Sequence, residues 1–252
     1  MAKLKSPMEK YLEKFSKPQI EFEQNDEGVE VAYIYTERFT GESLYSSKEN
    51  FNDFSEKIKS LYSVTFADPI VMEKFASGTV RNEESFQNTV KLQSLRCANQ
   101  YPFSAFFVMD NNNDNAVGYE VIGNGDQPNA GEVAYLFNKD YHRSQAIQDV
   151  GYECVGALVL EYGSEQHKRG SMVNQRYNEE TDEFENGEVF TKVQATSRID
   201  NPGSSKILEN LGFKHIGDSF KFGHDRYIWE KDYQAEEEMQ LVGLYEQNDN
   251  SL

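Results

Sequence analysis

The sequence predicts an α+β fold, mixed α/β in content, in which a central, mostly antiparallel twisted sheet is flanked by helices. Two patterns carry this prediction. Runs in which apolar and polar residues alternate are typical of strands, and apolar residues at spacings of three and four are typical of helices. The predicted segments alternate between strands and helices along the 252 residues, and the chain closes with strands. That order favours one mixed sheet covered by helices.

The first 18 residues are expected to form a short helical arm, because their apolar residues recur at spacings of four and three before Pro18. Residues 19–39 predict a hairpin, since two alternating runs flank an Asn-Asp-Glu-Gly turn at 25–28. Three helical segments are expected next, at 49–62, 68–75 and 83–98.

The middle of the chain predicts a meander of three antiparallel strands, at 103–109, 116–122 and 131–137. A long helix is expected over 150–165. An acidic insert from about 170 to 188 has six carboxylates around Phe184, which favours a solvated loop or a hairpin tip. A strand at 189–196 follows it.

Residues 201–213 predict a capped helix that ends at a glycine and leads into a strand. Asn201 can cap the first amides, and Pro202 is tolerated at the first helical position. Gly212 supplies a left-handed exit from the helix. Two further strands, at 215–222 and 226–231, are expected to close the sheet.

Composition predicts a single domain at 19–233, preceded by the arm at 1–18 and followed by an acidic extension at 234–252. The chain is 38% hydrophobic, which suffices for one substantial core. In the extension, acidic residues precede apolar ones at helical spacing, a pattern typical of an amphipathic helix that docks on its own domain or on a second subunit. A homodimer is therefore one expectation.

A net charge of −18 argues against nucleic acid or an anionic membrane as a partner, because both require a basic face. The charge either attracts a cationic substrate or only keeps the protein in solution. No apolar run has membrane length and no secretory segment is recognisable, so a soluble protein is expected. A disulfide framework between the two cysteines is not expected, which favours the reducing cytoplasm. The two cysteines and four histidines lack metal-ligand spacing, and no metal site is expected.

The motif at 201–213 resembles the second half of the domain of the GNAT superfamily of N-acetyltransferases. The resemblance rests on Asn201 and Ser204, three residues apart at the helix start, together with Gly212 and Phe213 at its end. The segments 68–75 and 131–141 are similar to the ribosomal-protein N-terminal acetyltransferase branch. The resemblance spans about 20–232 and implies a GNAT-like three-layer fold. It also implies transfer of acetyl from acetyl-CoA to a primary amine, on a protein N-terminus or a small cationic molecule.

In this family the pyrophosphate of acetyl-CoA rests on backbone amides where the central strand passes into the next helix. The best match here is 148–153, preceded by about six extra residues at 142–147. The resemblance places acetyl-CoA against Leu136, Phe137, Gln148, Val150, Gly151, Tyr152, Asn201, Ser204 and Lys206.

Asp149 and Glu153 put carboxylates where the family prefers small neutral residues. One uncompensated like-charge contact at about 4 Å costs roughly 4 kcal/mol at an effective dielectric near 20. Compensation is expected from Arg143, Lys206 or Arg198.

For catalysis, the resemblance assigns Glu132 as the general base that accepts the amine proton, and Ser204 as a contact of the acetyl-pantetheine arm. Family members commonly carry a tyrosine four residues after this serine as the proton donor to the thiolate, but Leu208 stands there. Tyr135 and Tyr141 are candidate substitutes. Each role has a structural alternative: a surface glutamate at a strand end, a helix cap, and a packing tyrosine. The alternative function is a catalytically impaired GNAT-like domain that serves acyl-CoA sensing or protein interaction.

Overall fold

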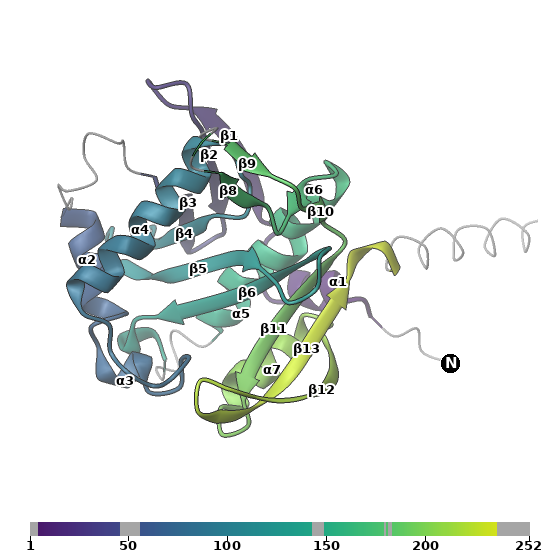
Figure 1. Cartoon of the computed structure of the whole chain (residues 1–252). Coiled ribbons are helices and arrows are strands. Elements are labelled where there is room, and N and C mark those ends of the chain that lie inside the picture. Colours follow the sequence, from purple (N-terminus) through teal and green to yellow (C-terminus); the bar gives the residue numbers. More distant parts are fainter. Residues whose placement is uncertain (1–4, 46–55, 143–148, 179, 181–182, 236–252) are drawn as a thin grey trace, which may run out of the picture.

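The computed structural model describes residues 5–45, 56–142, 149–178, 180 and 183–235, and its centre is a nine-stranded sheet (Figure 1). The strand order is β1-β2-β3-β4-β5-β6-β11-β13-β12. Neighbouring strands run antiparallel except β6 and β11, which are parallel. The predicted mixed fold with a mostly antiparallel sheet is confirmed.

The predicted hairpin is formed by β1 (Gln19–Gln24) and β2 (Glu30–Tyr35). A strand that the sequence did not predict, β3 (Phe39–Ser43), joins this hairpin to β4. Helix α1 (Pro7–Leu12) precedes β1, and Tyr11 of this helix is completely buried in the main core. The segment expected as an arm therefore contributes to the core of the sheet domain.

Three helices cover one face of the sheet: α2 (Glu56–Val64), α3 (Pro69–Met72) and α4 (Glu83–Ala98). All three fall in predicted helical segments, although residues 49–55 of the first lie outside the described residues. Asp68 starts α3 because its side chain accepts hydrogen bonds from the amides of Ile70 and Val71. The aromatic residues Phe66 and Phe86 anchor the core on this face.

The predicted meander is confirmed as β4 (Ala105–Asp110), β5 (Ala116–Asn124) and β6 (Ala130–Phe137), and a short 3₁₀ helix, η2 (Lys139–Tyr141), follows. The opposite face of the sheet is covered by one continuous helical stretch, made of α5 (Val150–Gly156), a π-helical segment η4 (Ala157–Gly163) and α6 (Ser164–Lys168). Figure 1 shows α5 and α7 behind the sheet, with α2 and α4 in front.

Where it is described, the acidic insert forms hairpin ladders, β7 (Met172–Val173) with β10 (Glu188–Val189) and β8 (Arg176–Asn178) with β9 (Glu183–Glu185). The strand after it, β11 (Lys192–Arg198), starts three residues later than predicted because β10 pairs with β7 instead of the main sheet.

The capped helix, α7 (Pro202–Asn210), follows β11, and Gly212 leaves it at a φ of +85°. The last strands are β12 (Lys214–Lys221) and β13 (His224–Asp232). The predicted extension at 234–252 lies outside the described residues beyond Ala235. Among the described helices, none combines the length and the apolar character that crossing a membrane would require.

Candidate active site

The candidate site lies where β6 and β11 part. Their parallel pairing covers three residue pairs and ends at Glu132 and Gln194. Beyond this point β6 pairs only with β5, and β11 only with β13. The remaining halves of the two strands therefore run apart, and Figure 1 shows this fork between them. Backbone groups along the inner sides of the fork are free of sheet partners.

Glu132 stands at the base of the fork. Strand alternation puts it on the same face as Leu136, which packs in the core under α2 to α4. Its carboxylate is half-buried, and the Thr196 hydroxyl on β11 donates toward Oε1 across 3.5 Å. Burial raises the pKa of Glu132, and the nearby Lys221 and Arg226 cations partly oppose that rise. A carboxylate with a raised pKa can accept a proton from a bound amine.

Tyr135 and Ser204 meet on the other face of the fork. Tyr135 Oη lies 2.7 Å from Ser204 Oγ at the start of α7. Burial raises the pKa of Tyr135 to about 12, so its phenol stays protonated at neutral pH. Asn201 caps α7, because its Oδ1 accepts the Ser204 amide at 3.2 Å. The fold thus brings together Tyr135, Ser204 and Asn201, three of the predicted site residues.

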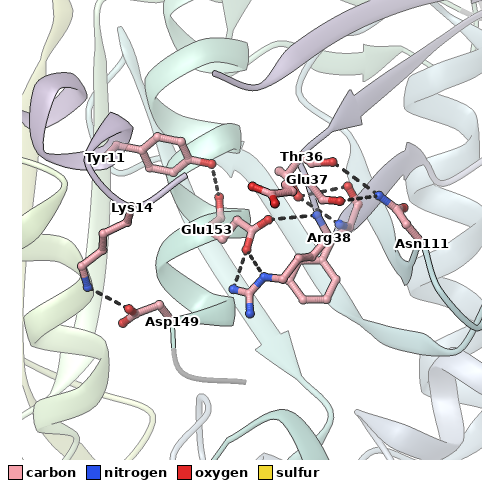
Figure 2. A network of polar contacts seen from close by, with 9 residues as sticks. Tyr11, Lys14, Thr36, Glu37, Arg38, Asn111, Asp149 and Glu153 are labelled. Atoms are coloured by element: carbon pink, nitrogen blue, oxygen red, sulfur yellow. Dashed lines mark hydrogen bonds and ion pairs between the residues drawn. The ribbon is translucent and has the colours of Figure 1, made fainter. Parts of the chain in front are cut away.

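The two carboxylates at the start of α5 are both neutralised (Figure 2). Glu153 is completely buried; Arg38 Nε donates to its Oε2 at 2.6 Å, and Arg38 Nη2 lies 2.5 Å from the same oxygen. Asp149, on the surface, is bound by Lys14 Nζ at 2.7 Å. Tyr11 adds a hydrogen bond from its hydroxyl to the carbonyl of Glu153 at 3.1 Å.

The prediction of compensating cations is wrong for two of the three residues. Lys206 pairs with Glu209 on its own helix, and Arg198 pairs with Asp200. Arg143 lies outside the described residues. The actual partners are Lys14, just after α1, and Arg38 in the β2–β3 turn. Both lie more than a hundred residues earlier in the chain, so sequence proximity could not indicate them.

Most of the other predicted cofactor contacts are core side chains. Leu136 packs on the α2 face, while Phe137, Val150 and Tyr152 belong to the core under α5, so a ligand could reach only their backbone. A Cβ on Gly151 would lie 2.7 Å from Ile207 Cδ1, so glycine here lets α5 approach α7. Gln148 lies outside the described residues, and Lys206 is largely exposed.

Sequence reasoning missed two residues that adjoin Glu132. Arg226 on β13 is 6% exposed and donates from Nε to Thr196 Oγ1 at 3.0 Å. Thr196 in turn contacts Glu132. The available signal was weak: a threonine on one predicted strand and an arginine at the start of another. Their proximity depends on the strand order β6-β11-β13, which no local pattern gives.

No protein-family model matches the chain, and no curated protein matches it. Solved structures do. An acetyltransferase of the GNAT family from Bacillus anthracis is similar with a TM-score of 0.55 and 18% identity, over 80% of this chain and 99% of that chain. The ribosomal-protein α-N-acetyltransferase RimL, in complex with coenzyme A, is similar with a TM-score of 0.52 and 13% identity, over 78% of this chain and 94% of that chain.

A third similar structure is the self-immunity acetyltransferase MccE in complex with acetyl-CoA and AMP, with a TM-score of 0.52 and 14% identity, over 78% of this chain and 93% of that chain. These identities are low, so the similarity concerns the arrangement of the backbone. The mixed sheet, the fork between its two parallel strands and these matches together establish that the chain has the fold of the GNAT superfamily.

Proposed function

We propose that this protein transfers the acetyl group of acetyl-CoA to a primary amine. The observation that carries the proposal is the fork between β6 and β11, with the half-buried Glu132 at its base and the Tyr135–Ser204 pair on its other face. A base and a protonated phenol on opposite sides of one opening are what proton transfer during acyl transfer requires. The GNAT fold supports this proposal, although fold alone does not determine function.

The residues at the start of α5 fit a bound anion. Among the described residues, the amides at this helix start receive no capping hydrogen bond from the Asp149 side chain. The carboxylates of Asp149 and Glu153 are each matched by a cation, which removes the repulsion expected from the sequence. The backbone of Val150 and Gly151 would hold the pyrophosphate, and Asn201 and Ser204 the pantetheine arm. Gln148 stays a predicted contact.

Acetyl-CoA would supply a thioester carbonyl that a neutral amine can attack. Glu132 would take the amine proton on its carboxylate, directly or through a water molecule. Tyr135 holds a proton on its phenol oxygen next to Ser204 and is the proposed donor for the leaving group. Tyr141 is less suitable because its hydroxyl donates to Oδ2 of Asp110, the last residue of β4, at 3.0 Å.

The acceptor is proposed to be a protein N-terminus or a small cationic amine. A net charge of −18 favours a cation, and RimL, one of the similar structures, is named as acting on a ribosomal protein. A cytoplasmic location is part of the proposal, because both cysteines are free and buried. A homodimer without nucleic-acid partners also stays a proposal, which light scattering and a gel-shift measurement would test.

One observation favours a second candidate, a catalytically impaired domain for acyl-CoA sensing or protein interaction. Leu208 holds the position where family members commonly carry a tyrosine, and it is 1% exposed in the core. If Tyr135 does not replace that tyrosine, acetyl-CoA would bind without efficient transfer.

Calorimetric titration with acetyl-CoA, followed by acetylation assays on a panel of peptides and polyamines, separates the candidates. We expect micromolar binding and measurable transfer, and a kcat at least about 100-fold lower for Glu132→Gln with unchanged cofactor binding. Glu23→Gln, on the exposed strand β1, is the matched control and should behave as wild type. Absence of binding at millimolar acetyl-CoA would refute the transferase and an acyl-CoA sensor, and would leave protein interaction as the surviving form of the second candidate. Binding without transfer to any amine would favour the second candidate as an acyl-CoA sensor.

A further inference from the structure

The Thr196 hydroxyl lies between a buried cation and the candidate base. Arg226 Nε donates to Thr196 Oγ1 at 3.0 Å, and Arg226 Nη2 donates to the Thr196 carbonyl at 3.1 Å. A guanidinium has donors and no acceptor, so the hydroxyl must accept this bond. Its own proton is then left for Glu132 Oε1, 3.5 Å away. Contacts of this length in a free enzyme often shorten when substrate binds.

Arg226 is a buried cation whose contacts, besides the two hydrogen bonds to Thr196, include the ring of Phe222, with its Cζ 5.7 Å from the ring centroid. Its side chain is 6% exposed, and its Nη1 has no hydrogen-bond partner among the described residues. No described carboxylate forms an ion pair with it, although Glu132 is close enough to interact electrostatically. Burying a cation with an unsatisfied N–H destabilises a fold. Such an arrangement is often retained because the charge acts on a neighbouring functional group.

The other charged groups around Glu132 are largely matched with one another. Lys221 on β12 binds Asp126 Oδ2 in the β5–β6 loop, and Lys192 binds Glu230 on β13 at 3.2 Å. From α4, Arg96 approaches the position opposite Glu132, since its Nη1 is 4.0 Å from where a Cβ on Gly123 would lie. Arg226 and Thr196 are therefore the pair linked to Glu132 by hydrogen bonds.

We propose that Arg226 and Thr196 are positioning residues for Glu132: Arg226 fixes the orientation of the Thr196 hydroxyl, and that hydroxyl orients the Glu132 carboxylate toward the fork. This inference rests on the proposed acetyl transfer. It assigns no contact with substrate to either residue. Both groups also stabilise the ionised form of Glu132, which extends its range as a base toward lower pH.

The kinetic test is the pH profile of kcat/KM for wild type, Thr196→Val, Thr196→Ser and Arg226→Met. Thr196→Val should lower kcat about tenfold, with the KM for acetyl-CoA unchanged, because one oriented hydrogen bond to a charged group is lost. Arg226→Met should move the acidic limb of the profile up by about one pH unit. Thr196→Ser keeps the hydroxyl and should retain the wild-type limb. Thr191→Val, just before β11, is the matched control, since Thr191 bonds Asn129 and not Glu132.

A second measurement does not require activity. With glutamate labelled at the carboxyl carbon, NMR titration follows Glu132, whose signal is the one missing in Glu132→Gln. Its midpoint should rise in Thr196→Val and Arg226→Met and stay unchanged in Thr191→Val. Unchanged midpoints would overturn the inference even if the protein acetylates amines. Raised midpoints in a protein without transferase activity would refute the proposed function, and with it a positioning role in catalysis. Arg226→Gln, which also removes the charge, replaces Arg226→Met if the latter does not fold.

Discussion

The carboxylates at the start of α5 and those on the middle strands β5 and β6 have opposite environments. Glu153 on α5 is completely buried and bound by Arg38 through two nitrogens, and Asp149 is bound by Lys14 (Figure 2). Glu120 on β5 is 1% exposed, and neither it nor Glu132 on β6 forms an ion pair with a described cation. Burial raises the pKa of both middle-strand carboxyls, that of Glu120 to about 8.

The carboxylates at the start of α5 are held in ion pairs, whereas the carboxyls on the middle strands have raised pKa values. The buried Glu153 carboxylate accepts hydrogen bonds from the backbone amide and from Nε of Arg38, and so it connects the β2–β3 turn to α5. A buried carboxyl without a cation can gain or lose a proton near neutral pH. The carboxylates at the start of α5 are therefore structural, while the backbone beside them is left for the proposed pyrophosphate site, and the middle strands carry the groups suited to proton transfer.

The largest effect is expected where the complete pair is broken. Arg38→Met should lower the free energy of unfolding by about 3–5 kcal/mol, because Glu153 keeps a buried charge without a partner. Urea unfolding measures this. The double variant Arg38→Met with Glu153→Gln should recover most of the loss. If Arg38→Met alone were as stable as wild type, the Arg38–Glu153 pair would not be needed for stability, and the contrast between the α5 carboxylates and the middle-strand carboxyls would not hold.

Glu120 should show the opposite behaviour. Its pKa is raised from 4.5 to about 8, so the folded state holds a proton that the unfolded state releases. Stability is therefore lost as pH rises from about 4.5 to 8, and Glu120→Gln removes this loss. At pH 9 the variant should be more stable than wild type by up to about 5 kcal/mol, and at pH 4 the difference should vanish. Unfolding at both pH values tests this, with Glu209→Gln on the exposed side of α7 as control. If the free energy of unfolding changed equally with pH in wild type and Glu120→Gln, the raised pKa of Glu120 would be contradicted.

Tyr135 should matter for transfer and hardly for stability. Tyr135→Phe removes the hydroxyl that meets Ser204 and should lower kcat about tenfold, or about 1.4 kcal/mol. Tyr141→Phe is the matched control, because its hydroxyl binds Asp110 away from the fork. Steady-state kinetics on the best acceptor of the panel measure both variants. A larger loss for Tyr141→Phe would transfer the role of proton donor to that residue.

The smallest effect is expected at the surface pair. The side chains of Lys14 and Asp149 are 49% and 40% exposed, so Lys14→Met should cost at most about 1 kcal/mol of stability. The loss should disappear in 1 M salt, where the pair is screened in wild type as well. Thermal unfolding at low and high salt distinguishes this pair from the Arg38–Glu153 pair, whose contribution should persist in salt.

Local sequence patterns predicted the elements that depend on local physics. Helix α4 was predicted at its observed bounds because its apolar residues recur at helical spacing, and the structure adds that Asn82 caps it. The Asn201 cap and the left-handed Gly212 were likewise readable. Strand β3 was missed because a five-residue segment with a central Gly41 has weak strand character, and its pairing with β2 and β4 decides it.

The candidate site was predictable only in part. Glu132, Tyr135, Asn201 and Ser204 were identified through the resemblance of their surrounding motifs, and the fold brings the last three together. Arg38, Thr196 and Arg226 were not identified, since their partners lie about 30 to 115 residues away. Charge repulsion at Asp149 and Glu153 was overestimated for the same reason.

The sequence by itself determined the fold class, the capped helix α7 and the residue types available for proton transfer, because capping, periodicity and turn chemistry act between near neighbours. Only the tertiary structure decided which carboxylates are neutralised and which keep an exchangeable proton. The protonation of a carboxylate depends on its burial and on cations supplied by distant strands. At Glu132, both the burial and the nearby cations follow from its place where β6 and β11 separate.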